Sequence, residues 1–244
     1  MNKPLIRADR AAKRYRVLKR QRSTLRALKA LLGRDKLTME FWALRDISFT
    51  VGRGEKVAVI GRNGSGKTTL LRLVAGIIEP SSGSMEVATE PLALFKFWIG
   101  QNADLPVIDN IYLFGAVCGM KRRQTEPLVA KILAAADVTA LGFAPLRDLS
   151  LGQRQRLALS IVFQAPADFL IFDETFVHVD QAFFRECNAF FVRLAESPRT
   201  MIITSHDHGF LKKYCRRAIW LDKGRIRLDG PAAEVIAAYE AEDK

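Results

Sequence analysis

The sequence predicts an α/β fold with a parallel central sheet and a helical block inserted into it. Short apolar runs of β type alternate with helical stretches along the chain. Several of these runs, such as residues 169–172, are continuously apolar, which is typical of strands buried on both faces of a parallel sheet. A mostly helical region separates the earlier strands from the later ones. The 244 residues, 49% of them hydrophobic, are enough to form the sizeable core that such a fold needs.

The expected elements can be assigned in order. The β-type runs predict strands over residues 43–51, 56–60, 169–172 and 201–204. The helical patterns predict helices over 68–77 and, inside a block from about Gln101 to Ala165, over 110–120, 125–136 and 150–163. Residues 218–228 predict a hairpin that turns at Lys223-Gly224, and residues 231–240 predict a closing helix. We therefore expect one domain over residues 1–244, in which 101–165 is a helical subdomain and 166–244 returns to the α/β core.

Most of the excess positive charge lies near the N-terminus. Thirteen basic and two acidic side chains precede residue 39, so these residues carry +11 of the formal net charge of +12. Within this segment Ser23 can cap a helix that runs to Gly33. A leucine stripe and a basic cluster share its surface: Leu25, Leu28, Leu31 and Leu32 beside Arg22, Arg26 and Lys29. Such a basic amphipathic helix is suited to an anionic membrane surface or a lipid-phosphate headgroup.

Other sequence signals bear on the compartment. No run approaches eighteen consecutive apolar residues, and the N-terminus lacks the apolar core of a secretory signal, so we expect a cytosolic chain. Three cysteines, Cys118, Cys187 and Cys215, are far apart and show no metal-ligand spacing. They are expected to be buried thiols in a reducing compartment.

The strongest functional signal is a glycine-rich segment that follows the predicted strand 56–60 and opens the predicted helix 68–77. Residues 61–68 match the GxxxxGK[ST] pattern, in which glycines let backbone N–H groups surround phosphate oxygens at a helix N-terminus. Lys67 is expected to reach the β- and γ-phosphates of ATP, and the Thr68 hydroxyl to bind Mg²⁺. The expected nucleotide-binding residues are Gly61, Asn63, Gly64, Ser65, Gly66, Lys67, Thr68 and Thr69.

Two carboxylates follow the apolar run 169–172. Asp173 and Glu174 stand where this strand ends, at the edge of a parallel sheet that binds ligands. Asp173 fits the role of holding Mg²⁺, and Glu174 can accept a proton from the attacking water. A phosphate-binding loop alone also fits kinases, helicases and GTPases, so further residues must distinguish these classes.

The segment Leu149-Ser150-Leu151-Gly152-Gln153 resembles the LSGGQ signature of ATP-binding-cassette (ABC) ATPases. Ser150 precedes Asp173 by 23 residues, in the order that this family requires, although Leu151 stands where glycine is usual. The resemblance covers nearly the whole chain. It implies the P-loop ABC ATPase fold, with a RecA-like α/β core, an antiparallel β subdomain and an inserted helical subdomain. It also implies a homodimer in which Ser150, Gly152 and Gln153 of one copy complete the ATP site of the other.

The resemblance implies further site residues. His206 follows the predicted strand 201–204, where the family has a switch histidine that contacts the γ-phosphate. Asp180 fits the D-loop, which meets the partner copy near the hydrolytic site. Gln101 fits the Q-loop residue that senses the γ-phosphate and binds the metal, with Asn102 as the alternative. The aromatic residue that stacks on adenine is Tyr15, which follows the first strand, or else Phe41 or Trp42.

One branch of the family fits best. Residues 16–40 form an insert before the second strand, and with the segment 41–49 that follows they make the chain similar to the ATPases of O-antigen and teichoic-acid exporters. That branch implies a lipid-linked polysaccharide cargo, an integral membrane permease subunit and a cytoplasmic position on the inner face of the cell membrane. Residues 16–38 would contact the membrane surface. The chain would then be a short form, capsule exporters included, or a shortened piece of a longer member.

Two other functions stay open. An exporter of another cargo, such as a drug or a lipid, fits the same motifs, because the cargo is chosen largely by the membrane partner. A soluble ABC protein associated with nucleic acid would place the basic segment on phosphate backbones. The sequence has no second cassette and no aromatic residues interleaved with the basic ones, so no nucleic acid is expected.

Overall fold

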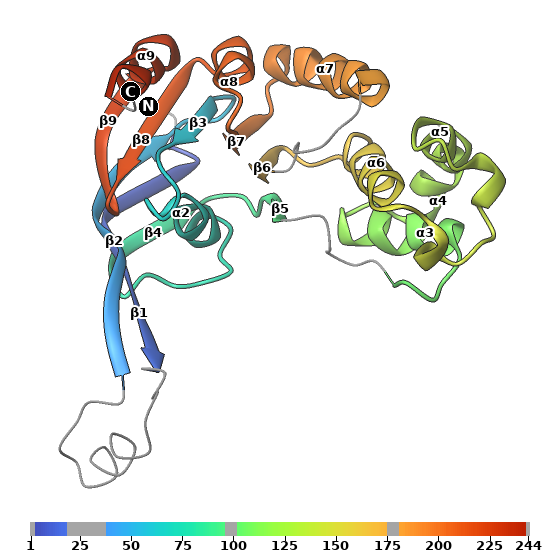
Figure 1. Cartoon of the computed structure of the whole chain (residues 1–244), viewed down its shortest axis with the longest axis horizontal. Helices are drawn as coiled ribbons and strands as arrows, with labels where there is room; N and C mark the ends of the chain where they lie inside the picture. Colours follow the sequence, from blue (N-terminus) through green and yellow to red (C-terminus); the bar gives the residue numbers. More distant parts are fainter. Residues whose placement is uncertain (1–2, 19–37, 96–101, 175–180, 243–244) are drawn as a thin grey trace, which may run out of the picture.

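The computed structural model describes residues 3–18, 38–95, 102–174 and 181–242 (Figure 1). The helix expected at 23–33, Gln101 and Asp180 lie outside these described residues. Within them, the chain forms two sheets and a set of helices.

The larger sheet has six strands in the order β5-β6-β7-β3-β8-β9. Their bounds are β3 Lys56–Ile60, β5 Leu92–Phe95, β6 Phe169–Asp173, β7 Thr200–Thr204, β8 Arg217–Asp222 and β9 Arg225–Pro231. Neighbouring strands are parallel, except β8 and β9, which form the hairpin predicted around Lys223-Gly224. The predicted parallel sheet is therefore confirmed, and β5 is an edge strand that the sequence patterns did not indicate.

The side chains of this sheet divide the interior into two cores. Along β6, Phe169 and Ile171 belong to one cluster of buried residues, whereas Leu170 and Phe172 belong to the other. This follows from the two-residue period of a strand, which sends successive side chains to opposite faces. All five residues of β6 are buried. The uniformly apolar sequence of the strand is thus explained by cover on both faces.

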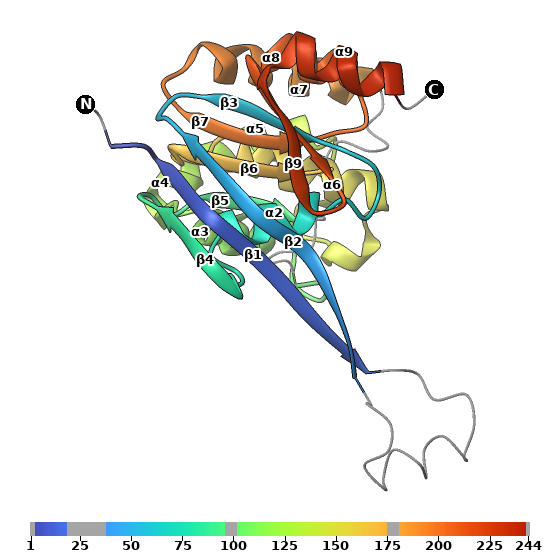
Figure 2. The ribbon, with the colours of Figure 1, turned by 90° about the vertical axis from the view of Figure 1, so that its left-hand side faces the viewer.

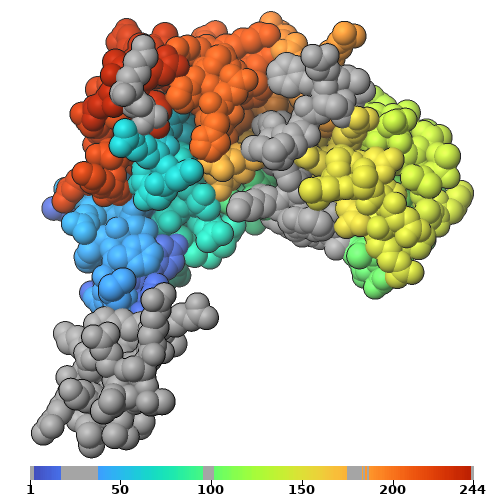
Figure 3. Space-filling view, viewed as in Figure 1, coloured from blue at the N-terminus to red at the C-terminus, as the bar shows by residue number. Residues whose placement is uncertain are grey.

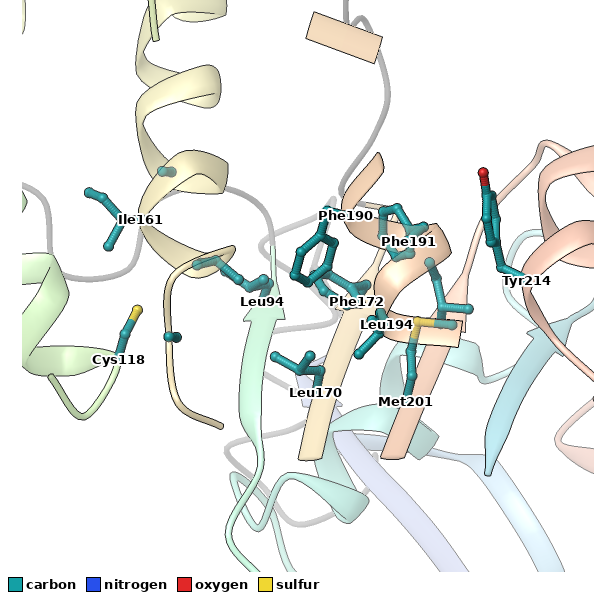
Figure 4. Packing of buried hydrophobic residues seen from close by; sticks show 14 of the residues in the cluster. Leu94, Cys118, Ile161, Leu170, Phe172, Phe190, Phe191, Leu194, Met201 and Tyr214 are labelled. Atoms are coloured by element: carbon teal, nitrogen blue, oxygen red, sulfur yellow. The ribbon is translucent and has the colours of Figure 1, made fainter. Parts of the chain in front are cut away.

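Four helices surround the sheet: α2 Lys67–Val74, α7 Gln181–Glu196, α8 His208–Tyr214 and α9 Ala232–Glu242. Side chains of α7, α8 and α9 share the core on one face, and α2 contributes to the core on the other. Phe190 and Phe191 of α7 contact Phe172 of β6 edge to face (Figure 4). Each such ring that is removed from water stabilises the fold by about 1.5–3 kcal/mol.

The region between β5 and β6 is helical and extends to one side of the sheet (Figures 1 and 3). Its helices are α3 Val107–Val117, α4 Arg122–Thr125, α5 Val129–Ala135 and α6 Leu151–Val162, joined in part by 3₁₀ turns. The helix predicted over 110–120 is α3, which begins and ends three residues earlier. Gly119 explains the earlier end, since its φ of +83° stops helical continuation.

The smaller sheet is antiparallel, with the order β2-β1-β4. Its strands are β1 Ile6–Leu18, β2 Thr38–Val51 and β4 Ser82–Val87. Tyr15 was expected to follow the first strand, and this was wrong: β1 continues through Tyr15 because residues 14–18 pair with residues 38–42 of β2. The two ends of the segment 16–40 are therefore strands (Figure 2).

Candidate functional site

The phosphate-binding loop connects β3 to α2. Gly61 and Gly66 have φ values of +141° and +110°, which side chains with a Cβ rarely adopt. A Cβ on Gly66 would lie 2.7 Å from the carbonyl oxygen of Ala43, and one on Gly61 would lie 2.2 Å from that of Leu221. Both positions therefore require glycine, because the neighbouring backbone atoms leave no room for a Cβ. The loop between them is held in one shape.

We expect Gly66→Ala to lower the free energy of unfolding by about 3 kcal/mol, because positive φ and a backbone collision both oppose it. Gly64 is the matched control: its φ is +82°, but a Cβ there would meet nothing within 4 Å. Gly64→Ala should therefore cost only about 1 kcal/mol. Urea unfolding of the two variants measures the difference. Equal losses would contradict the argument from packing.

Lys67 is the first residue of α2 and is 8% exposed. Its Nζ atom donates to the carbonyl oxygens of Gly61, at 2.7 Å, and Arg62, at 3.3 Å. Burial lowers the pKa of the Lys67 ammonium, whereas the charges of Glu174 and Asp173 act to raise it. The loop therefore holds a cation at the N-terminus of a helix, where backbone N–H groups also favour anions.

Asp173, at the end of β6, joins this loop to two strands of the sheet. Its Oδ2 atom accepts from the Thr68 hydroxyl at 2.8 Å, and its Oδ1 atom accepts from the Thr204 hydroxyl at 2.8 Å. Asp173 is 5% exposed. A carboxylate and a hydroxyl oxygen in contact are the hard oxygen ligands that Mg²⁺ prefers. The donor set therefore fits the expected metal.

Glu174 lies next to Lys67 and His206. Its Oε1 atom is 3.0 Å from Nε2 of His206 and 3.9 Å from Nζ of Lys67. The backbone φ of Glu174 is +50°, a strained conformation for a residue other than glycine and one that tends to occur at active sites. Its N–H donates to the hydroxyl of Thr204 at 2.9 Å, which holds the residue in this conformation. The carboxylate is thus aimed at the loop.

Thr204 is a site residue that the sequence patterns did not single out. It ends β7, beside β6, is fully buried, and bonds to Asp173 and to the backbone of Glu174. The sequence did contain a signal for it. Thr204 is the polar residue that ends the apolar run 201–203, and parallel neighbouring strands end at the same edge of a sheet, so Thr204 could have been placed beside Asp173. Its hydroxyl fixes both carboxylate residues.

Ser65 supports the fit of a phosphate group. Its Oγ atom is buried and, among the described residues, has no hydrogen-bond partner. A buried hydroxyl without a partner is costly, and such groups commonly mark a ligand or a functional strain. Asn63 and Gly64, at the tip of the loop, are exposed, and Thr69 lies in the first turn of α2. The loop therefore presents a buried hydroxyl that no described residue uses.

The signature residues lie apart from this loop, at the start of α6. Ser150 caps the helix: its hydroxyl accepts from the N–H of Gln153 at 3.2 Å, and the Gln153 side chain accepts from the N–H of Ser150 at 2.9 Å. Ser150 and Gly152 are exposed, and Leu151 is 64% exposed. No contact of these residues with the phosphate-binding loop is present among the described residues. They face solvent instead.

The side chain of Asn102 is not free to contact a γ-phosphate, as a residue that senses this group would need to be. Its Oδ1 atom accepts from the N–H of Asp104 at 3.0 Å. Its backbone is held by Asn110, which is 1% exposed and bonds to both its N–H and its carbonyl oxygen. Asn102 therefore stabilises a turn.

The three aromatic candidates for adenine stacking lie on β1 and β2. Tyr15 and Phe41 stack at 5.6 Å between ring centroids. Trp42 precedes Ala43, whose carbonyl oxygen would lie 2.7 Å from a Cβ on Gly66 in the phosphate-binding loop. Trp42 pairs with Arg14, so it lies on the other face of these strands, and the structure groups only Tyr15 with Phe41.

Comparison with known proteins gives the family. The family model described as ABC transporter matches residues 44–177, just over half of the chain. The ABC transporter protein AbcA of Aeromonas salmonicida is 32% identical over 239 residues, which cover 98% of this chain and 77% of that protein. The O-antigen export system ATP-binding protein RfbB of Klebsiella pneumoniae is 34% identical, covering 88% and 85%. The teichoic acids export ATP-binding protein TagH of Listeria innocua is 34% identical, covering 86% and 62%.

Solved structures give the same fold. One described as the ATP-binding subunit of an ABC transporter has a TM-score of 0.71 at 19% identity and covers 97% of this chain and 93% of its own. A dimeric ATP-binding cassette bound to ADP and phosphate also has a TM-score of 0.71, at 17% identity, covering 93% and 98%. The fold, the family match and the relatives that are more than 30% identical agree. The chain belongs to the ABC transporter family and is an ATPase of that family.

Proposed function

We propose that the chain is the ATP-hydrolysing subunit of an exporter that moves a lipid-linked polysaccharide, of O-antigen, capsule or teichoic-acid type, across the cytoplasmic membrane. The observation that carries the hydrolytic part is the joined set of Lys67, Thr68, Asp173, Glu174 and His206 at one edge of the sheet. The names of the O-antigen and teichoic-acid relatives, RfbB and TagH, support the cargo.

The geometry supports a proposed role for each residue of this set. The loop from Gly61 to Thr69 binds the phosphates of ATP. Lys67 exchanges its hydrogen bonds to the carbonyl oxygens of Gly61 and Arg62 for contacts with the β- and γ-phosphates. Thr68 and Asp173 would hold Mg²⁺, which would supply neutralisation of the phosphate charge. Glu174 accepts the proton of the attacking water, and His206, 3.0 Å away, orients that carboxylate and meets the γ-phosphate.

A second copy of the chain completes the site. Ser150 and Gly152 are exposed at the N-terminus of α6, away from their own phosphate-binding loop. A helix N-terminus that faces solvent is suited to an anion brought by a partner. In the proposed homodimer each signature, Gln153 included, closes on the ATP of the other copy, and Asp180 is proposed to act at the same boundary. Only the closed dimer contacts ATP with the phosphate-binding loop of one copy and the signature of the other. Hydrolysis removes the ATP that stabilises the closed state, so the dimer reopens.

The export role requires a membrane partner. None of the described helices is long and apolar enough to cross a membrane. We therefore propose that an integral permease subunit forms the path for the cargo and holds the ATPase on the inner face of the membrane. Gln101 is proposed as the residue that links ATP to this partner, because the side chain of Asn102 is already used in a turn.

The proposal is tested by expressing the chain together with a candidate permease. The candidate is a protein with about six predicted apolar spans, whose gene lies beside the gene of this chain and beside glycosyltransferase genes. We expect the two proteins to purify together and to restore surface polysaccharide in a host that makes but does not export it. Lys67→Ala is the control and should keep the complex while abolishing export. Surface polysaccharide that is unchanged by omitting the ATPase would contradict the proposed cargo.

A further inference from the structure

A cavity of about 600 Å³ lies at the edge of the larger sheet that is opposite the phosphate-binding loop. It is formed where β3 and β8 begin and where the chain enters β7. β7 and β3 run side by side (Figure 2), and both β7 and β8 are parallel to β3, so the three strands begin at one edge. Asp173 and Thr204 end their strands at the other edge. The five residues of β3 separate the two edges by about 16 Å.

One of the charged side chains in this cavity is a buried lysine. The cavity is lined by four cations and two acids: Arg53, Lys56, Arg216, Arg217, Glu55 and Glu196. Lys56 is 7% exposed, and its Nζ atom donates to the carbonyl oxygens of Gly54, at 2.9 Å, and Ser197, at 2.6 Å. An ammonium group has three donors, so one N–H of Lys56 has no partner among the described residues. Burial lowers the pKa of Lys56, and the charge of Arg216 lowers it further.

The acids of the cavity do not neutralise all of these cations. Glu55 accepts from Arg217 at 3.0 Å and from the N–H of Gly52 at 2.7 Å. Arg217 also forms two bonds of 2.7 Å with Asp229, and these carboxylates raise the pKa of its guanidinium. Glu196 is exposed and, within the part of the chain that the structure describes, forms no ion pair. The paired acids therefore serve Arg217.

The other three cations, Arg53, Lys56 and Arg216, form what we call the cationic cavity set. Arg53 has one weak hydrogen bond, to the hydroxyl of Thr89 at 3.4 Å. Arg216 bonds to the carbonyl oxygen of Lys56 through its backbone N–H, at 3.2 Å, and its guanidinium has no partner among the residues described. Guanidinium groups offer paired donors that match phosphate oxygens, and an ammonium group adds a point charge. The set is therefore suited to a phosphate group.

The cavity has room for more than an inorganic anion. Its volume of about 600 Å³ is within the range of about 300–1,000 Å³ that is usual for small-molecule sites. Ala195, in the last turn of α7, and Pro198, which follows that helix, add apolar surface to the wall. The aliphatic stems of lysine and arginine side chains provide similar surface. An organic group attached to the phosphate can be accommodated here.

We propose that this cavity binds a small phosphorylated molecule at a site separate from that of ATP. The phosphate is held by Arg53, Lys56 and Arg216, and the buried Lys56 contributes its remaining N–H. The organic part lies against Ala195 and Pro198. This site goes beyond the proposed function and does not depend on the cargo of the exporter.

The first test measures the binding of radiolabelled inorganic pyrophosphate by equilibrium dialysis. Pyrophosphate carries the anionic chemistry that the cavity recognises and has no organic part. A non-hydrolysable ATP analogue with excess Mg²⁺ saturates the phosphate-binding loop beforehand, so that only a further site is counted. We expect saturable binding of one pyrophosphate per chain at millimolar concentrations. Absence of saturable binding under these conditions would overturn the proposal.

Substitutions then locate the bound anion. Arg216→Gln is expected to weaken pyrophosphate binding about tenfold, because a charge-assisted hydrogen bond is lost. Arg123→Gln is the matched control: it removes the same charge from an exposed position on α4, outside the cavity, and should leave binding unchanged. Equal weakening by the two variants would overturn the proposal, because net charge would then account for the attraction.

Lys56→Met tests the buried cation while keeping an apolar stem of similar length. We expect it to weaken pyrophosphate binding at least as much as Arg216→Gln does. Lys56 also holds the carbonyl oxygens of Gly54 and Ser197, so thermal unfolding must show that the fold persists. If Lys56→Met does not fold, Arg216→Gln alone decides, since its side chain has no bond to a described residue. Unchanged binding by a folded Lys56→Met would refute the site.

Competition tests the organic part of the ligand. A hexose phosphate, glycerol phosphate and phenyl phosphate are each titrated against bound pyrophosphate, with inorganic phosphate as the reference. We expect at least one of these esters to displace pyrophosphate at several-fold lower concentration than inorganic phosphate does, because its organic part gains contact with the apolar wall. If no ester competes better than inorganic phosphate, the cavity is not a site for a phosphorylated molecule.

Discussion

Replacing Lys67 with Ala is expected to reduce the rate of ATP hydrolysis by about 10³-fold, because one preorganised cation is lost beside the phosphates. Lys67 is the single ammonium group that the structure brings within 4 Å of Glu174 among the described residues. Phosphate release by the purified full chain at saturating ATP measures this effect. ATP affinity should fall as well, which a fluorescent ATP analogue measures.

Two controls separate this loss from misfolding. Lys67 also satisfies the carbonyl oxygens of Gly61 and Arg62, so its removal affects the loop itself. Thermal unfolding of Lys67→Ala shows whether the fold persists. Lys131→Ala removes a lysine from the helical region, away from the loop, and should keep the full rate. Hydrolysis by Lys67→Ala at the rate of the unaltered chain would remove Lys67 from the site.

Replacing Glu174 with Gln is expected to lower the hydrolysis rate by about 10²–10⁴-fold while leaving ATP binding intact. The two side chains have the same shape, but the amide cannot accept the proton of water. The backbone bonds of residue 174 to Thr204 remain, so the strained conformation is kept. Single-turnover hydrolysis and equilibrium ATP binding measure the two properties separately.

The matched control is Glu86→Gln, which removes a carboxylate from an exposed position on β4 and should change neither property. Loss of ATP binding by Glu174→Gln would make Glu174 a binding residue. Turnover at the full rate would exclude it as the proton acceptor. A parallel loss of rate in His206→Ala, with ATP binding retained, is expected because His206 holds the same carboxylate.

Much of this site could be predicted from sequence because its parts are local. The run 61–68 contains its glycines, its lysine and its threonine, and it lies between the mostly apolar strand β3 and the helix α2. Asp173 and Glu174 directly follow such a strand. In these places the chemistry and the element that positions it are neighbours in the chain. The structure places Thr68 and Asp173 in contact across 105 positions, as the shared sheet edge implies.

The rest depends on contacts that no local pattern records. Thr204 acts through its register with Asp173 on a neighbouring strand. Asn102 is an alternative to Gln101 in sequence, and only the hydrogen bonds of Asn102 with Asn110 and Asp104 reveal that its side chain is used in a turn. Tyr15 was placed after the first strand because the long pairing of β1 with β2 cannot be read from β1 alone.

The helix α7 shows the same limit for secondary structure. Its sixteen residues include four Phe, one Cys and one Asn, all of them weaker helix formers than Ala or Leu. Burial of Phe183, Phe190 and Phe191 against the sheet and α6 overrides that preference. The tertiary core, and not the local propensity, determines this helix.

The central claim is that ATP is hydrolysed at a site made by the phosphate-binding loop of one copy and the signature of another. The most direct measurement is the mass and nucleotide content of the Glu174→Gln chain after incubation with ATP and Mg²⁺. We predict a dimer that holds two ATP molecules, and a monomer when Ser150→Arg is added. A monomer that retains ATP in Glu174→Gln alone, or a dimer that forms without nucleotide and survives Ser150→Arg, would contradict the account.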